Sequence, residues 1–402
     1  MPKAANRMGT MQRYIFGELD EAIAREERSG RTICDLSQSD PNWDPSPTVA
    51  HALVTAAERS GSHRYPPYGG DLALRRAFAE WYERHYDAPC TPEHVLILEG
   101  SKTGIALLPF AYLDAGDVGL VPDPGYPTYR AGVSLAGGQP VAMPLQAVLG
   151  YLPCYADLDP ERLQRAKLMF LNYPHNPTGA VAPRPFLEDT VDFARRYDLL
   201  VGYDLAYAQI VLQGLRPARA LRTIAGADAL AIEFFTFSKS YDMQGYRLGA
   251  AVANPDLLAP LRKVHENVTA GAFLPIQAAG RAALDPHEDM AVEERIEGYR
   301  HRQDILYDAL QELGAHVTHP QATVYLWLRS PRDLSGGRFA QELLRGPGIA
   351  VTPGSAFGQQ GNAYVRISLT APDDVVAEAA ERLRRFYPQG LEARPHEALQ
   401  AH

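Results

Sequence analysis

The sequence predicts an α/β protein in which helices sandwich a mostly parallel sheet, followed by a smaller α+β part. Two observations lead to this fold class. Short apolar runs alternate with longer helical patterns, and this alternation is typical of a parallel sheet covered by helices. Polar residues also follow directly after several of these runs, and open α/β sheets bind ligands at the carboxyl ends of their strands. The apolar runs cover residues 95–98, 118–121, 168–171, 199–203, 232–237 and 248–252.

The other segments divide the chain into three parts. Residues 1–45 precede the sheet and are expected to pack on the C-terminal part. Residues 46–283 form the large domain, which includes a helix over 72–82, and residues 284–402 form the small domain. We expect the ligand cleft between the two domains. In the small domain the patterns predict a long helix over 293–313, strands over 324–328, 350–352 and 363–368, and a closing helix over 372–386.

Composition excludes several classes of function. The 402 residues, 46% of them hydrophobic, suffice for two or three domain-sized units. A net charge of −9 argues against a nucleic-acid-binding surface. No apolar run is long enough to span a membrane, and no secretory signal is evident. Cys34, Cys90 and Cys154 show neither disulfide nor metal-ligand spacing, so we expect reduced thiols in a cytoplasmic protein without a metal site.

The segment over residues 236–249 is the most informative one for function. It places Lys239 between the hydroxyls of Ser238 and Ser240, and Arg247 follows eight residues after Lys239. A lysine attacks an aldehyde only as the free amine, and desolvation beside an apolar strand lowers its pKa. An arginine can bind a phosphate through a forked pair of donors. The pattern therefore favours a Schiff base beside a phosphate, although a polar turn with a surface lysine is the alternative.

Two further strand ends carry side chains that suit a pyridine ring. Asn176 lies in a tight turn after the run 168–171, where its amide could hydrogen-bond a ring hydroxyl. A plain turn explains the same residues equally well. Asp204 ends a buried strand, and a buried carboxylate needs a cationic partner such as a protonated ring nitrogen. For an isolated aspartate, a helix cap is the competing interpretation.

Residues 100–104 lie between the strand 95–98 and a helical stretch that runs to residue 113. Backbone N–H groups at a helix N-terminus bind anions, and Ser101 adds a hydroxyl. The segment lacks the spacing of a P-loop. Each of these turns is weak evidence alone, but together they suit a single ligand.

These motifs identify a resemblance to the fold type I pyridoxal-phosphate enzymes. The chain resembles the class I/II aminotransferases, and among them the LL-diaminopimelate aminotransferase-like branch, from about residue 14 to about residue 386. Five more segments carry the likeness, namely residues 14–16, 65–70, 123–127, 271–277 and 364–368.

The resemblance implies a role for each matching residue. Lys239 would hold pyridoxal 5'-phosphate as a Schiff base, Asp204 would pair with its ring nitrogen, and Tyr126 would stack on the ring. Asn176 and Tyr207 would contact the phenolic oxygen. The phosphate would be surrounded by Ser101, Lys102, Thr236, Ser238 and Arg247.

The resemblance also implies how substrate and partner bind. Arg366 would bind the substrate α-carboxylate, with Tyr14, Asn176 and the backbone of Ser37 nearby. Tyr65 would reach the phosphate of the neighbouring subunit, which makes the active unit a homodimer. The reaction implied is ping-pong transfer of an amino group between an L-amino acid and a 2-oxo acid, in which Lys239 moves the proton as general base and acid.

Three segments depart from the family pattern. Residues 37–41 carry serines where glycine is usual, so the carboxylate pocket is expected to be reshaped. Leu274 replaces an asparagine that helps to hold the substrate in the diaminopimelate branch, and Asn42 and Trp43 replace an acidic and smaller pair. Two alternatives stay open: a lyase, cyclase or oxidase on the same scaffold, and a non-catalytic protein that binds the cofactor.

Overall fold

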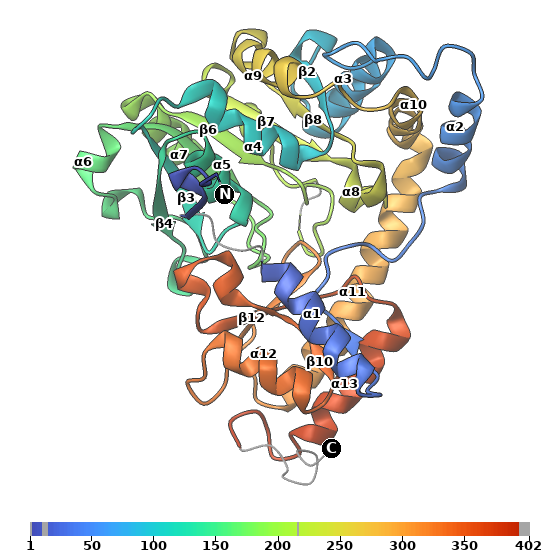
Figure 1. Ribbon diagram of the computed structural model, residues 1–402, viewed down its shortest axis with the longest axis vertical. Coiled ribbons are helices and arrows are strands. Elements are labelled where there is room, and N and C mark those ends of the chain that lie inside the picture. The colour runs from blue at the N-terminus through green and yellow to red at the C-terminus, as the bar shows by residue number, and fades with distance from the viewer. Residues whose placement is uncertain (1, 10–14, 215–216, 394–402) are drawn as a thin grey trace.

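A computed structural model describes residues 2–9, 15–214 and 217–393 of the chain. A seven-stranded sheet lies in the upper part of the view in Figure 1, in the order β2-β8-β7-β6-β5-β3-β4. Only β8 runs antiparallel to its neighbours. The strands are β2 (Val95–Leu98), β3 (Val118–Asp123), β4 (Gln139–Pro144), β5 (Ala166–Asn172), β6 (Leu200–Asp204), β7 (Ala231–Thr236) and β8 (Gly249–Val252). The predicted fold class is confirmed.

All six predicted runs form strands of this sheet, because each is apolar enough to be buried on both faces. The seventh strand, β4, escapes the sequence analysis because it contains Pro140 and Pro144 and is only partly buried. An edge strand tolerates proline, since one of its sides needs no backbone donors.

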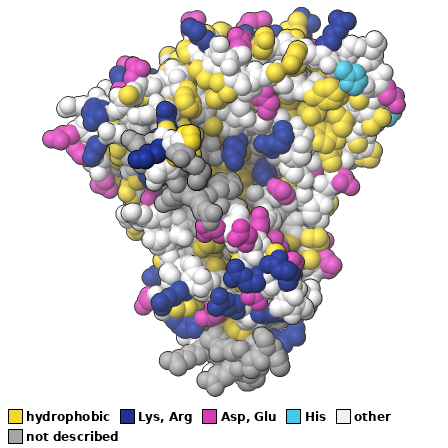
Figure 2. All heavy atoms as spheres, in the orientation of Figure 1, with side chains coloured by type: hydrophobic (Ala, Val, Ile, Leu, Met, Phe, Trp, Pro, Cys, Tyr) yellow, Lys and Arg dark blue, Asp and Glu magenta, His cyan; other side chains and the backbone are white. Residues whose placement is uncertain are grey.

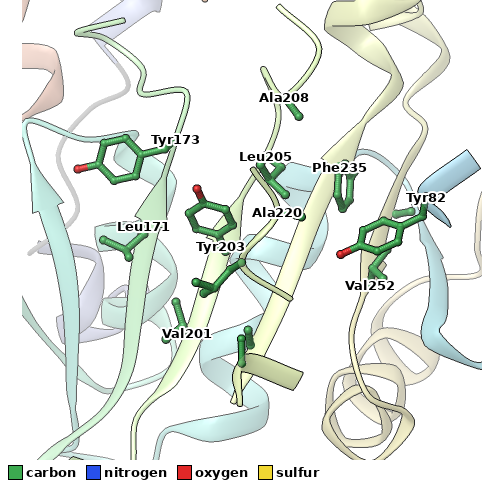
Figure 3. Close-up of a cluster of buried hydrophobic side chains, with 14 of the residues drawn as sticks. Tyr82, Leu171, Tyr173, Val201, Tyr203, Leu205, Ala208, Ala220, Phe235 and Val252 are labelled. Carbon is green, nitrogen blue, oxygen red and sulfur yellow. The ribbon is translucent and has the colours of Figure 1, made fainter. Parts of the chain in front are cut away.

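Helices cover both faces of the sheet. Along β5, Leu168 and Phe170 pack with α4, α5 and α9, while Met169 and Leu171 pack on the opposite face with α3 and α7. Figure 3 shows part of this second core, in which Leu171, Val201 and Phe235 come from neighbouring strands. The helices of this part are α2 (Pro47–Ala57), α3 (Leu72–Tyr86), α4 (Ser101–Tyr112), α5 (Pro127–Leu135), α6 (Pro160–Leu163), α7 (Arg184–Tyr197), α8 (Phe237–Ser240), α9 (Pro255–Val268) and α10 (Leu274–Ala283).

The C-terminal part has its own core around a three-stranded antiparallel sheet of order β11-β12-β9. The long helix α11 (Asp289–Glu312) runs from the first part into this one (Figure 1). The other elements are β9 (Tyr325–Arg329), α12 (Gly336–Arg345), β10 (Ile349–Ala350), β11 (Thr352–Pro353), β12 (Tyr364–Ser368) and α13 (Asp373–Phe386).

Residues 19–35 of the N-terminal segment pack on the C-terminal part, whereas Arg7 donates to the Leu135 carbonyl of α5. In Figure 1, α1 (Ile15–Arg28) lies beside α12 and α13, and Ile23 packs against Leu344 and Ala350. The short strand β1 (Cys34–Asp35) pairs in parallel with β10. This pairing corrects one prediction: residues 350–352 form two strands in two sheets, because β10 joins β1 whereas β11 joins β12.

The sheet brings five predicted site residues to one edge. The strands β2, β3, β5, β6 and β7 all point the same way, so their carboxyl ends meet. Ser101, Tyr126, Asn176, Asp204 and Lys239 lie at or just after these ends.

Candidate functional site

Lys239 lies in the short helix α8, which begins directly after β7. The hydroxyl of Thr236 caps α8 by accepting the backbone N–H of Ser238 at 3.2 Å. The Lys239 Nζ atom donates to the backbone carbonyl of Ser39 at 2.5 Å. Burial lowers the pKa of Lys239, and the nearby Arg366 and Arg247 lower it further, against the opposing effects of Tyr325 and Asp40. A lowered pKa increases the fraction of Lys239 that is present as the free amine at a given pH.

Asp204 is a buried carboxylate with neutral partners. Its Oδ2 atom accepts the Tyr129 hydroxyl at 2.7 Å and its Oδ1 atom accepts the Ala206 N–H at 3.0 Å. Burial raises the pKa of Asp204 to about 6, although both hydrogen bonds lower it. No ion pair of Asp204 exists within the described ranges of the chain. The carboxylate is therefore suited to a cationic ligand atom.

We expect the cofactor-free protein to lose stability between about pH 4 and about pH 6, relative to the Asp204→Asn variant. Over this window folded Asp204 keeps its proton while the unfolded chain releases it, so the free energy of unfolding falls as the pH rises. The loss should reach up to about 3 kcal/mol above pH 6, from a shift of roughly two pKa units. Denaturant unfolding of both proteins measures this loss. The expectation is contradicted if the free energies of unfolding of the two proteins depend on pH in the same way.

A cradle for an anion lies at the N-terminus of α4. Gly100 precedes Ser101 with a φ of 85°, and a Cβ atom at Gly100 would come within 2.7 Å of the Arg247 guanidinium. Gly249 also approaches the backbone of Ser101 so closely that a Cβ atom would lie 2.6 Å from its nitrogen. Helix N–H groups, hydroxyls and a guanidinium therefore converge. In the face shown in Figure 2, Lys and Arg side chains gather at the centre, above a row of Asp and Glu side chains.

The rest of the predicted phosphate set lies around this cradle. The Thr236 hydroxyl donates to the Ser238 hydroxyl at 3.0 Å. Lys102 lies in the first turn of α4 with an exposed side chain. The structure thus places Ser101, Thr236, Ser238 and Arg247 together, with Lys102 at the solvent side.

Arg366 lies at the centre of β12 and is 2% exposed. Its Nη2 atom donates to the Ser37 carbonyl at 3.0 Å, and its Nη1 atom donates to the Asn176 Oδ1 atom at 3.2 Å. The Tyr325 and Phe357 rings lie 4.2 and 4.9 Å from the guanidinium carbon. Two aromatic faces hold the guanidinium plane, which favours bidentate binding of a carboxylate.

Asn176 and Tyr207 lie between the residues around Asp204 and those around Arg366. The Asn172 side chain accepts the Asn176 N–H at 2.9 Å and donates to the Asp204 carbonyl at 2.9 Å, so Asn176 is held beside Asp204. The Tyr207 hydroxyl lies 2.6 Å from the Tyr325 hydroxyl.

The remaining predicted residues are Tyr126, Tyr65 and Tyr14. Tyr126 caps α5, and its ring meets the Tyr129 ring edge to face at 5.8 Å. Tyr65 is 87% exposed. Tyr14 lies outside the described residues.

Sequence reasoning missed several residues of the site. Tyr129, Tyr325, Phe357 and Asn172 all contact the predicted set. Tyr129 follows Tyr126 by three residues on α5, a spacing that puts both on one helix face. For Tyr325 and Phe357 the sequence carries no local signal, because their contacts form only when strands pair.

The residues present fit pyridoxal 5'-phosphate. The fit rests on a buried carboxylate that has no cationic partner in the described part of the chain, a glycine-lined helix N-terminus beside Arg247, and a lysine with a lowered pKa. Among the described residues, no helix has both the length and the apolar character to cross a bilayer.

Comparison with known proteins agrees with this geometry. The family described as "Aminotransferase class I and II" matches residues 31–383. An LL-diaminopimelate aminotransferase of Moorella thermoacetica is 42% identical, over 95% of this chain and 97% of that protein. Another, from Halothermothrix orenii, is 39% identical over 94% and 97%. Substrate-bound BacF from Bacillus subtilis superimposes with a TM-score of 0.90 at 32% identity, over 96% of this chain and 98% of that one.

This chain belongs to the class I and II aminotransferase family. It is a transaminase that depends on pyridoxal phosphate, and the predicted likeness to the LL-diaminopimelate aminotransferase-like branch is confirmed.

Proposed function

We propose that this aminotransferase exchanges an amino group between an L-amino acid and a 2-oxo acid, with Lys239 as the proton carrier and Arg366 as the carboxylate anchor. One observation carries the assignment of roles. Arg366 and Lys239 contact carbonyl groups two residues apart in the chain, since Arg366 donates to Ser37 and Lys239 donates to Ser39. A substrate anchored at Arg366 through its α-carboxylate therefore presents its α-carbon toward Lys239.

Each protein group has one task in this proposal. When bound, pyridoxal phosphate supplies an electron sink for the substrate α-carbon. As the free amine, Lys239 would take the proton from the substrate α-carbon and return it to the carbon two atoms away, beyond the nitrogen, which the bound cofactor would supply. Asp204 keeps the ring nitrogen protonated, and Tyr129 orients Asp204 through its hydrogen bond. Arg366 and Asn176 hold the carboxylate, and the α4 N-terminus with Arg247 holds the phosphate.

LL-diaminopimelate is the first donor to test, because relatives of this chain carry that name. Leu274 is apolar and cannot hydrogen-bond a distal polar group, so we propose that a panel of other L-amino acids will include better donors. Loss of the bound cofactor's absorbance on addition of each donor measures the first half-reaction. Formation of many equivalents of 2-oxo acid per active site without any amino acceptor would favour the lyase, cyclase or oxidase alternative instead.

We further propose that the active unit is a homodimer in the cytoplasm. Tyr65 and Tyr68 are 87% and 55% exposed in the arm before α3, and Val268 and Phe273 are 63% and 42% exposed beside α10. Figure 2 shows hydrophobic side chains gathered at the upper right, where α2 and α10 lie in Figure 1. An exposed apolar patch of this kind supports a subunit interface. The three cysteines are free thiols, which supports a reducing compartment.

We expect Tyr65→Ala to weaken cofactor binding by about tenfold or more, the worth of one hydrogen bond to a charged group. Equilibrium titration with pyridoxal phosphate measures this change. Val148→Ala, which removes an 84% exposed side chain elsewhere, is the matched control and should bind normally.

Subunit exchange provides the sharper test of the dimer. In a hybrid of Tyr65→Ala and Lys239→Ala chains, one site receives Lys239 from the first chain and an intact Tyr65 from the second. That site should regain normal cofactor affinity and activity. A fully active monomer, measured by light scattering at assay concentration, would contradict the proposal.

A further inference from the structure

Trp43, one of the residues at which the chain departs from its family pattern, lies against one face of α11. The Arg302 guanidinium carbon lies 4.1 Å from the indole centroid, and that of Arg295 lies 5.3 Å away. The Tyr299 ring meets the indole edge to face at 4.9 Å. Spacings of three and four residues place these side chains on one helix face.

The helix carries a notch that admits the indole. A Cβ atom at Gly298 would come within 2.8 Å of the Trp43 Cζ2 atom. Glycine in a helix interior costs about 1 kcal/mol relative to alanine, and here the missing side chain is what lets Trp43 approach α11.

Both guanidinium groups are themselves anchored. Arg302 is 2% exposed and donates to the Asp373 carboxylate at 2.6 Å and to the Asn42 side chain at 2.7 Å. Arg295 donates to the Asp242 carboxylate at 2.7 Å, three residues after Lys239 in the chain. The indole is thus held by charges that are fixed to α13 and to the loop of the catalytic lysine.

Residues 37–41, just before Trp43, form an irregular segment that contacts both Lys239 and Arg366 and is called here the 37–41 turn. Its carbonyl groups accept hydrogen bonds from side chains of several elements, while its flank is held by Asn42 and Trp43. The acceptor and donor pairs are Ser37 with Arg366 and Thr352, Gln38 with Thr370, Ser39 with Lys239, and Pro41 with Gln244.

We propose that Trp43 is a positioning residue: its indole, seated in the Gly298 notch between Arg295 and Arg302, holds the 37–41 turn in the register that orients Arg366 and Lys239. Of the five described side chains that donate to its carbonyl groups, Arg366 and Lys239 must also serve the substrate. The indole supplies an anchor that stays in place when a substrate carboxylate engages Arg366.

The expected rise in KM rests on the proposed function, because it requires that Arg366 binds the substrate carboxylate. If the indole is removed, the turn gains freedom, the Ser37 carbonyl no longer orients the guanidinium, and carboxylate binding weakens. Amide exchange in the turn reports the loss of the anchor independently of any role in catalysis.

The test compares Trp43→Ala, Trp43→Phe and Gly298→Ala as purified proteins. We expect Trp43→Ala to raise the KM for an amino donor about tenfold, the equivalent of one desolvated cation–π contact, with kcat changed less than about threefold. Amide exchange of residues 36–44, followed by mass spectrometry, should accelerate by a similar factor. Trp43→Phe should recover most of both effects, since a smaller ring still lies between the guanidinium groups.

Gly298→Ala should reproduce the direction of the change by pushing the indole out of its notch. It also carries the test if Trp43→Ala fails to fold. Tyr307→Ala is the matched control, because it removes an aromatic ring of α11 that contacts His319 instead of the turn. It should leave both the KM and the exchange of residues 36–44 unchanged.

The inference is overturned if exchange and KM stay at wild-type values in Trp43→Ala and Gly298→Ala. It is also overturned if exchange accelerates while KM does not move, since Trp43 would then stabilise the fold alone. If Arg366→Ala leaves the KM unchanged, the proposed carboxylate role is what fails, and the exchange result still decides whether Trp43 anchors the turn.

Discussion

Replacing Lys239 by alanine is expected to abolish transamination, with a fall in kcat of at least about a thousandfold. General acid and base catalysis alone contributes about 10²- to 10⁴-fold, and Lys239 also forms the covalent link to the cofactor. Lys239 lies at the carboxyl edge of the sheet with a pKa lowered by burial. Single-turnover formation of the 2-oxo acid and the absorbance spectrum of the protein measure the two losses separately.

Lys167→Ala is the matched control for this variant. Lys167 is an exposed lysine of β5, remote from the carboxyl edge of the sheet, and its removal should leave kcat unchanged. Lys239→Arg keeps the charge but not a free amine, and it should be as inactive as Lys239→Ala. An active Lys239→Ala protein with a normal spectrum would refute the assignment.

Replacing Arg366 by alanine is expected to lower kcat/KM for amino donors by the equivalent of about 2 to 5 kcal/mol, because the donors bind more weakly. The guanidinium is buried between the Tyr325 and Phe357 rings, so its loss removes a desolvated, bidentate partner of the α-carboxylate. Arg366→Lys should recover only part of the affinity, because an ammonium lacks the planar fork. Steady-state kinetics and the binding of a non-reactive 2-methyl amino acid measure the effect.

Arg329→Ala serves as the control for Arg366. Arg329 belongs to the neighbouring strand β9 of the same sheet, but its side chain is exposed, so kcat/KM should not change. Thermal unfolding of each variant separates lost binding from lost structure. Equal kcat/KM in Arg366→Ala and in the wild type would move the carboxylate role to another residue.

Much of the fold and of the candidate site could be predicted because the signals are local. A parallel strand buried on both faces needs a continuous apolar run, and all six such runs became strands. Lys239, Asp204 and Asn176 stand at strand ends, so their shared location follows from the direction of the strands. The strand β4 could not be predicted, because its prolines are compatible only with an edge position.

The partners of these residues come from distant parts of the chain. Tyr129 and Asp204 are 75 residues apart, Tyr207 and Tyr325 are 118 apart, and Arg366 and Ser37 are 329 apart. Local patterns carry no information on such pairs, because side-chain proximity depends on how the sheets and helices pack. For the same reason, the sequence shows that the serines of the 37–41 turn are unusual, but it does not predict which side chains donate to their carbonyl groups.

The order of apolar runs and turns was enough to define six of the seven strands and the residues at the carboxyl edge of the sheet, because strand formation and chain direction depend on neighbouring residues. The class of cofactor followed from the family resemblance that the motifs at these turns carry. The pKa values of the site residues, in contrast, depend on the folded structure. Asp204 has a raised pKa because the packed sheet excludes water from it, and Lys239 has a lowered one because burial and two arginines from other elements act on it. In the sequence, Trp43 is only a departure from a family pattern. In the structure, α11 places Arg295, Gly298 and Arg302 against its ring. Burial and charge act through space, so only the packing of distant segments decides them.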